Sequence, residues 1–259
     1  MPESARDHIL DTIAKNTYIK KLIIESRPQY ITDDTLDVLE KALKGKTVEI
    51  GFGVESENDL VRNTILNKDI SKADFIALKN RTKRTTIKLL AYVLIKPPFL
   101  SEAEAILEAI TTINYANSLN VDVISIEPVS VQENTLVWLL SENGLYTPPW
   151  IWSIIQIVST VYNVGTEIRI GGFEYYPLPK QYVSNCEYCN SDFVEAIQAF
   201  NASYNLDKLL ETACVNQCHK EWQKSLGVIE KEAIVDRAIR ILESIDVEKT
   251  IEVRSKLHC

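Results

Sequence analysis

From Ile87 to Ile106 the chain reads IKLLAYVLIKPPFLSEAEAI. The run IKLLAYVLI has the length and composition of a buried strand, and the prolines after it cannot continue the hydrogen-bonded ladder of a sheet. Ser101 then stands three residues before Glu104, which is the capping-box pattern of a helix start. Ile110 and Ile113 continue one apolar face of that helix. The stretch therefore predicts a buried strand followed by a helix that packs on it.

The same alternation extends over the first 175 residues. Further apolar strands are expected at 21–25, 47–54, 121–126 and 167–170, with helical patterns between them. Near-continuous apolar strands that alternate with amphipathic helices indicate an α/β fold, in which helices cover a parallel sheet through right-handed crossovers. After residue 175 the pattern changes to a loop, a cysteine-rich segment and helices expected over 195–210 and 230–248.

The overall charge is acidic. The 259 residues carry a net charge of −8, the wrong sign for a free-standing nucleic-acid binder, whose affinity comes largely from Lys and Arg. One basic run without an acid stands out, and it is either a solvated helix end and loop or a phosphate contact. This run consists of Lys79, Arg81, Lys83, Arg84 and Lys88.

The chain carries no sign of a membrane segment. No apolar run approaches the roughly 20 residues that a spanning helix needs. The first residues, MPESARDHIL, are charged and polar, unlike a signal peptide. We therefore expect a soluble, cytoplasmic protein without membrane contact.

Charged side chains follow the expected strands where each strand ends. Because chemistry in parallel α/β sheets gathers at the carboxyl ends of the strands, these residues are expected to share a cleft. The alternative is that they are polar surface residues, such as follow many strands. The residues are Glu25, Ser26, Arg27, Glu55, Ser56, Lys96 and Glu127.

Four of the five cysteines crowd into one segment, as CxxC followed after a gap by CxxxC. In a chain of cytosolic character this pattern indicates metal binding before disulfides, and four thiolates suit a structural Zn²⁺ ion. An auxiliary iron–sulfur cluster and free buried thiols are the alternatives, and His219 could replace one thiolate. The four are Cys186, Cys189, Cys214 and Cys218, while the fifth, Cys259, is terminal.

Several motifs resemble the later strands of the radical S-adenosylmethionine (SAM) core that the Elongator catalytic subunit shares with related tRNA-modifying enzymes. The resemblance is greater still to the radical SAM proteins of archaeosine biosynthesis, and the cysteine segment fits their cysteine-bearing C-terminal region. The motifs are IIESRPQYIT (23–32), VEIGFGVESENDLVR (48–62), LIKPPFLSEAEAI (94–106), ISIEPVSVQENTLV (124–137), YTPPWIWS (146–153) and IRIGGFE (168–174).

The resemblance implies a partial, incomplete TIM-type barrel of parallel strands over residues 1–175 and a helical, cysteine-bearing segment over 176–259. The implied cofactors are SAM and a 4Fe–4S cluster. By resemblance, Glu55 and Ser56 contact polar groups of SAM, and Lys96 pairs with the SAM carboxylate or an acidic substrate group. A snorkelling surface lysine is the alternative for Lys96.

The implied substrate is tRNA. The resemblance implies the radical SAM step of archaeosine formation, a lyase reaction on a lysine-bearing deazaguanine that a partner transferase has placed in tRNA. Arg27, Lys83 and Arg84 are the candidates for tRNA contact, although Arg27 could instead pair with Glu25. Glu127 is a weaker candidate for the cofactor site.

One departure from the family is large. These enzymes hold their cluster through CxxxCxxC after the first strand, and no cysteine precedes Cys186 here. The ESRP motif belongs to about the third strand of the family core, so the cluster loop and roughly two strand–helix units are expected to be absent. The chain is then a fragment, one half of a split enzyme completed by a second chain, or a non-catalytic zinc-binding accessory or tRNA-binding module. An incomplete sheet also leaves an exposed edge, which predicts a partner or self-association.

Overall fold

The structure is a computed structural model that describes residues 2–173, 175–214, 217–228 and 230–245. Cys259 and the last residues of the helix expected over 230–248 lie outside these ranges.

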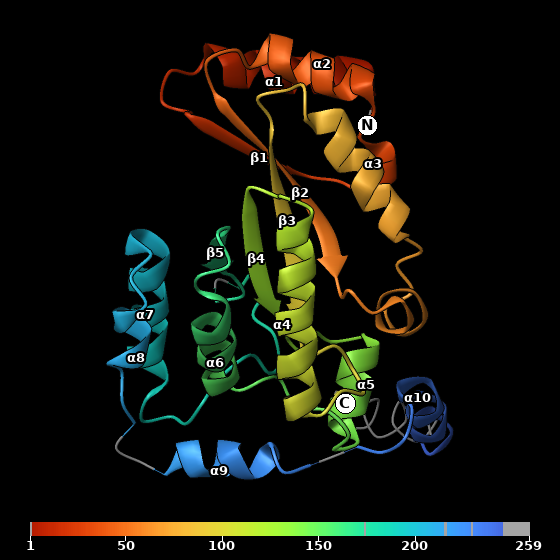
Figure 1. Cartoon of the computed structure of the whole chain (residues 1–259), viewed down its shortest axis with the longest axis vertical. Helices are drawn as coiled ribbons and strands as arrows, with labels where there is room; N and C mark the ends of the chain where they lie inside the picture. The colour runs from red at the N-terminus through yellow and green to blue at the C-terminus, as the bar shows by residue number, and fades with distance from the viewer. Residues whose placement is uncertain (1, 174, 215–216, 229, 246–259) are drawn as a thin grey trace, which may run out of the picture.

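A single parallel sheet organises the chain (Figure 1). Its five strands are hydrogen-bonded in the order β1-β2-β3-β4-β5, and every neighbouring pair is parallel. All five strands expected from the sequence are present, which confirms the α/β fold. They are β1 (Lys21–Glu25), β2 (Thr47–Glu55), β3 (Lys88–Ile95), β4 (Val123–Pro128) and β5 (Glu167–Ile170).

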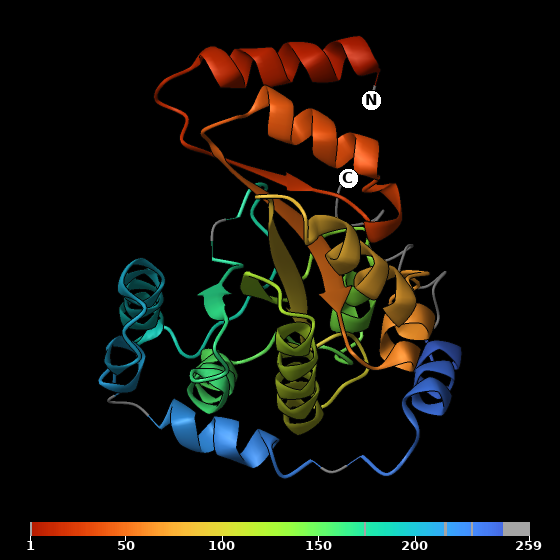
Figure 2. The ribbon, with the colours of Figure 1, turned by 45° about the horizontal axis from the view of Figure 1, so that its top comes forward.

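The connecting helices follow the capping signals. The capping box of Ser101 and Glu104 is formed, and Thr32 accepts a hydrogen bond from the N–H of Thr35 at the start of another helix. Figures 1 and 2 show α3, α4 and α6 along one side of the sheet. The α-helices of the chain up to residue 161 are α1 (Glu3–Lys15), α2 (Asp33–Ala42), α3 (Lys72–Thr82), α4 (Glu102–Ser118), α5 (Leu136–Glu142) and α6 (Ile151–Val161).

The C-terminal segment is helical, with boundaries that differ from the expectation. The helix expected over 195–210 is two helices, because Tyr204 adopts a left-handed conformation with φ 51° that ends the first. The last described helix is shorter than expected at both ends. Figure 1 shows α9 running across the ends of α4 and α6. The helices are α7 (Asn190–Ser203), α8 (Asp207–Leu210), α9 (Cys218–Ser225) and α10 (Ile234–Glu243).

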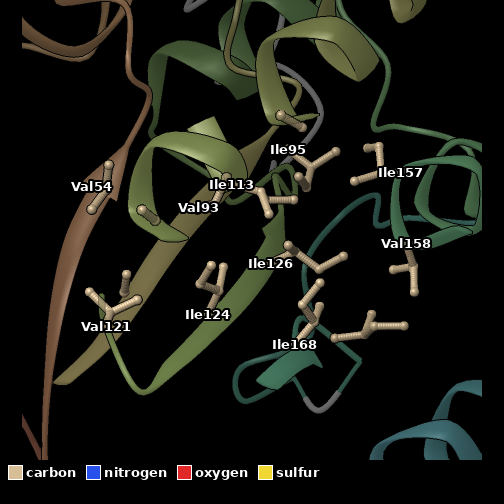
Figure 3. Packing of buried hydrophobic residues seen from close by; sticks show 14 of the residues in the cluster. Val54, Val93, Ile95, Ile113, Val121, Ile124, Ile126, Ile157, Val158 and Ile168 are labelled. Carbon is tan, nitrogen blue, oxygen red and sulfur yellow. The ribbon is translucent and has the colours of Figure 1, made fainter. Parts of the chain in front are cut away.

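One face of the sheet forms the core. Val93 and Ile95 of β3 and Ile126 of β4 are fully buried beneath Ile113 of α4 and Ile157 of α6, as Figure 3 shows. Full burial of a side chain of this size contributes roughly 1.5–3 kcal/mol. These positions alternate along the strands with the residues of the opposite face, so the apolar core determines which side chains turn away from the helices.

Candidate active site and cysteine group

The second face of the sheet is polar. Parallel sheets are normally apolar on both faces, because helices cover both. Here the strand register places Tyr92 beside Ser125, and Ser125 beside Arg169, in one row across β3, β4 and β5. We call this the polar face, and it also carries Glu25, Glu49 and Glu127. Charged side chains on the polar face indicate that this face contacts a ligand and is not covered by a second layer of helices.

A cleft of about 620 Å³ lies at the carboxyl ends of the strands on the polar face. This strand-end cleft is lined by residues from β1, β2, β3 and β4 and from the loops after β1 and β2. Five of the residues expected from the sequence meet there, and Lys68 and Tyr92, which were not expected, also line the cleft. The expected ones are Glu25, Ser26, Arg27, Glu55 and Glu127.

Glu55 stands at a strained position. Its φ of 59° lies in the left-handed region, and the register of β2 against β3 shifts between Gly53 and Glu55. Lys68 Nζ lies 2.7 Å from Glu55 Oε1. A Cβ on Gly53 would overlap the same oxygen, so any other residue there would displace the carboxylate from this position. Strained non-glycine residues cluster at functional sites.

Glu127 is the carboxyl group of the cleft with the raised pKa. Burial raises the pKa of Glu127, and the nearby negative charges of Glu55 and Glu25 raise it further. The hydrogen bond that Ser125 Oγ donates at 2.7 Å lowers this pKa in part. A Cβ on Gly171 would come within 2.2 Å of Glu127 Oε1, so a glycine at the end of β5 makes space for it.

Glu25 and Arg27 do not pair with each other. Glu25 Oε1 accepts a hydrogen bond from the Tyr92 hydroxyl at 2.9 Å, and burial together with this carboxylate raises the pKa of Tyr92. Arg27 Nη2 donates to the backbone oxygens of Lys68 at 2.6 Å and Asp69 at 2.9 Å. Arg27 therefore holds the loop that presents Lys68 to Glu55.

Two expected members of the cleft lie elsewhere. Ser56 is fully buried, and its hydroxyl bonds to Glu108 of α4, so it fixes the loop after β2. Lys96 Nζ lies 2.7 Å from Glu102 Oε2 and 3.4 Å from Thr147 Oγ1, in a separate cavity of about 430 Å³. Lys96 has a φ of 59°, which turns it from the polar face. Contrary to the expectation from the sequence, neither Ser56 nor Lys96 lines the strand-end cleft.

The basic run lies away from the cleft. Lys83 and Arg84 are exposed in the connection that leads into the amino end of β3, whereas the cleft lies at the carboxyl ends. Within the same run, Lys79 and Arg81 donate to the backbone oxygens of Asn120 and Pro28.

A buried carboxylate braces the polar face nearer the amino ends of the strands. Glu49 of β2 is 2% exposed, and Lys21 Nζ of β1 lies 2.7 Å from it. Arg169 of β5 reaches it at 2.9 and 3.4 Å across the intervening strands, which requires a curved sheet. Although burial raises the pKa of Glu49, hydrogen bonds from Arg169 and Lys21 hold it below its usual range.

Replacing Glu49 with glutamine is expected to lower the free energy of unfolding at neutral pH by about 1–3 kcal/mol, because charge-assisted hydrogen bonds are lost. A folded-state pKa below the unfolded value stabilises the protein above the ordinary glutamate pKa, and this contribution disappears as the pH falls. The gap between the wild type and E49Q should therefore shrink in acid. Urea unfolding at a series of pH values measures it, with Glu142→Gln on the exposed end of α5 as the control. A gap that does not change with pH would contradict this account.

The cysteine group, which comprises Cys186, Cys189, Cys214 and Cys218, comes together from the segment before α7 and the start of α9. All four Sγ atoms lie within 4.8 Å of one another, with neighbouring pairs at 3.3–3.8 Å. Zn–S bonds of about 2.3 Å in a tetrahedron place sulfurs about 3.8 Å apart. The group therefore fits a single metal ion.

The surroundings of the cysteine group also suit a structural site. Trp152 Nε1 donates to Cys218 Sγ at 3.3 Å, a contact of the kind that orients metal ligands. His219 packs against the ring of Trp152, with centroids 4.8 Å apart, rather than joining the sulfurs. A four-iron cluster holds its cysteine sulfurs around a larger cube. Within the described ranges no other group of cysteines exists, so this part of the chain does not fit the radical SAM cluster.

Arg62 is an important residue that the sequence reasoning missed. Its guanidinium is fully buried and donates to the backbone oxygens of Ile70 and Ser56, both at 2.8 Å. It thereby closes the loop that carries Glu55 at one end and Lys68 near the other. A lone arginine in the polar stretch SENDLVR gives no sequence signal for burial.

Among the described residues, no helix is both long enough and apolar enough to cross a membrane. No protein-family profile matches the chain.

Two of the curated relatives that match the chain share a name. Archaeosine synthase subunit beta of Methanosarcina acetivorans is 32% identical over 228 residues, which are 88% of this chain and 65% of that protein. The protein of the same name from Thermococcus kodakarensis is 31% identical over 157 residues, 61% of this chain and 48% of that protein. The chain thus spans less than two-thirds of the length of either relative.

Among solved structures, an N-terminally deleted Elp3 of Methanocaldococcus infernus shares the fold. It superimposes with a TM-score of 0.52 at 18% identity, over 75% of this chain and 43% of that one. The comparisons confirm the resemblance that the strand-end motifs indicated: the chain is similar in sequence to archaeosine synthase subunit beta and shares the fold of the Elp3 structure.

Proposed function

We propose that this chain supplies the SAM and substrate cleft of a radical SAM enzyme that forms archaeosine in tRNA. The observation that carries the proposal is the meeting of Glu25, Glu55 and Glu127, from three parallel strands, in one cleft of about 620 Å³. The names of the relatives support the reaction, and the position of the cleft supports its chemistry, because parallel sheets place ligands at their carboxyl ends.

In enzymes of this type a reduced 4Fe–4S cluster supplies the electron that cleaves SAM. We assign the cluster to a CxxxCxxC segment outside the described cysteines, in a second chain or in a further part of the natural protein. The residues of this chain bind SAM and the substrate and orient them. The carboxylates of Glu25 and Glu55 accept hydrogen bonds from ammonium or ribose hydroxyl groups of the ligand. Glu127, with its raised pKa, can donate a hydrogen bond when it is protonated.

The open edge of the sheet supports a partner. Within the described ranges β1 pairs only with β2, and Ile23 in β1 is 45% exposed. An apolar groove beside this edge is lined by side chains of α1, β1 and α2, including Ile9 and Leu22. An unpaired parallel edge with apolar surroundings favours addition of further strands. We propose that the cluster-bearing segment covers it, and that tRNA arrives from the transferase that installs the deazaguanine.

The cysteine group is proposed to hold a structural Zn²⁺ ion. Tetrahedral tetrathiolate sites of this spacing are closed to substrate and stabilise the local fold. Trp222 of α9 donates to Ser153 Oγ of α6 at 2.9 Å, so an ion at the group would anchor α9 against the core. We propose residue 175 as the boundary between the catalytic core and this metal-bearing segment.

The test is reconstitution. The chain is co-purified with a protein that contains the CxxxCxxC motif, and the iron–sulfur cluster is reduced. SAM is then supplied together with tRNA that bears the lysine-linked deazaguanine. We expect 5′-deoxyadenosine and archaeosine to form. Glu55→Gln is expected to lower the rate of SAM cleavage at least about tenfold, the scale of one lost charged hydrogen bond. Glu195→Gln on the exposed surface of α7 is the matched control.

Two results would contradict the proposal. Archaeosine formed by the CxxxCxxC protein alone would show that this chain is dispensable. If the assembled pair binds zinc but does not cleave SAM, the chain is a zinc-binding accessory module and not part of the enzyme.

A further inference from the structure

A second pocket of about 400 Å³ differs chemically from the strand-end cleft. It lies between the segment that leads into α6, with Thr147 and Trp150, and the segment before α7, with Gln181, Tyr182 and Asn185. We call it the amide pocket. No charged side chain lines it, whereas amides, hydroxyls and aromatic rings do. Its volume lies within the range of about 300–1,000 Å³ typical of small-molecule sites.

Backbone hydrogen bonds fix the walls of the amide pocket. Gln181 pairs with Val131, whose N–H donates to its carbonyl at 2.8 Å. The N–H of Ile151 donates to the carbonyl of Ser184 at 3.4 Å. The Asn185 N–H donates to Asn190 Oδ1 at 2.6 Å. The backbone of the pocket is therefore formed in advance, while Gln181 and Tyr182 are exposed at its mouth.

Asn185, which lines the amide pocket, carries a donor without a partner among the described residues. Asn185 Oδ1 accepts from the N–H of Trp152 at 3.2 Å, which fixes the orientation of the amide. Its Nδ2 is buried and makes no hydrogen bond within the described ranges. An unsatisfied buried donor is costly unless a ligand supplies an acceptor.

We propose that the amide pocket binds a nucleobase of RNA. Asn185 and Gln181 would bond to the edge of the base, and Trp150 or Tyr182 would stack on its face. Proteins read unpaired RNA bases by this combination of amide hydrogen bonds and aromatic stacking. The uncharged lining disfavours phosphate or carboxylate ligands, since these need a cation. The inference rests on the proposed function, in which tRNA is the substrate.

The pocket also lies close to the proposed active site. The ring of Tyr182 is 5.3 Å from that of Tyr175. Gln181 of the pocket wall pairs with Val131, which follows Glu127 of the cleft by four residues, so the amide pocket and the strand-end cleft lie on adjoining segments. One tRNA can therefore contact both sites.

The experiment titrates the full chain, loaded with its metal, with 2-aminopurine riboside, a fluorescent purine that stacking quenches. We expect saturable quenching by the wild type and by the control Gln156→Ala, an exposed amide on α6. Asn185→Asp keeps the acceptor for Trp152 and removes the Nδ2 donor, so its dissociation constant should rise about tenfold. Gln181→Ala, which leaves the backbone pairing with Val131 intact, should weaken binding in the same direction.

Metal content of each variant shows whether the neighbouring cysteine group is still folded. Absent or unsaturable quenching by the wild type, or equal affinities for all four proteins, would overturn the inference. A parallel filter-binding titration with tRNA separates the two proposals. If tRNA binds and the riboside does not, the pocket assignment fails while the proposed function stands. If the riboside binds and tRNA binds neither this chain nor its assembly with the CxxxCxxC protein, the proposed function fails.

Discussion

Replacing Arg62 with methionine is expected to lower the free energy of unfolding by about 2–6 kcal/mol. Methionine fills much of the same space but removes the donor to the carbonyls of Ser56 and Glu57, at about 1–3 kcal/mol each. The carbonyl of Ile70 keeps the hydrogen bond that Asn63 Nδ2 donates. Arg62→Lys should recover little, because an ammonium cannot reproduce the planar fork that reaches both oxygens. Urea unfolding measures the change.

The same substitution is expected to loosen the cleft. Arg62 closes the loop that brings Lys68 to Glu55, so SAM cleavage by the assembled enzyme should fall even at temperatures where R62M remains folded. Arg6→Met is the control for stability, since among the described residues the guanidinium of Arg6 pairs with its exposed neighbour Asp7 alone. An R62M protein as stable as the R6M protein would show that the buried guanidinium has no structural role.

Cys186→Ser is expected to abolish stoichiometric metal binding and to destabilise the C-terminal segment. Serine is a poor ligand for a soft thiolate site. An ion present at a thousand times its dissociation constant stabilises the folded state by about 4 kcal/mol, and its removal should cost as much. Elemental analysis and thermal unfolding with and without a chelator measure both effects.

Cys259→Ser supplies the matched control, because Cys259 is the one cysteine outside the cysteine group. It should keep its metal and its unfolding temperature. A C186S protein with a full equivalent of metal, or a wild type whose unfolding a chelator leaves unchanged, would contradict the assignment.

The elements of this fold could be predicted because each has a local signal. The five strands are short apolar runs that end at charged residues or prolines, and the capping box at Ser101 marks α4. The approximate position of the strand-end cleft followed from topology alone, since parallel strands bring Glu25, Glu55 and Glu127 to one edge.

The direction of individual side chains could not be predicted. Lys96 follows a strand as Glu55 does, yet a buried acid on the first turn of α4, Glu102, draws it into another cavity. Ser56 turns inward because Glu108, two turns along the same helix, accepts its hydroxyl. Ser56 and Glu108 are 52 positions apart, and no periodicity of the sequence connects either pair.

The side-chain contacts between strands of the sheet could not be predicted from the sequence either. Tyr92 belongs to an apolar run, and only its place between β2 and β4 makes its hydroxyl a partner of Glu25. The contact of Arg169 with Glu49 spans 120 positions of sequence and depends on the curvature of the sheet. The cysteine group was predicted better, because CxxC and CxxxC spacings restrict where thiolates can meet.

We propose above all that the strand-end cleft receives SAM. A crystal structure of this chain, assembled with its CxxxCxxC partner and soaked with SAM, tests it most directly. Our account predicts the amino-acid and ribose groups of SAM within hydrogen-bond distance of Glu55 and at least one of Glu25 and Glu127. SAM bound away from all three carboxylates, or bound beside Lys96 and Glu102 instead, would contradict it.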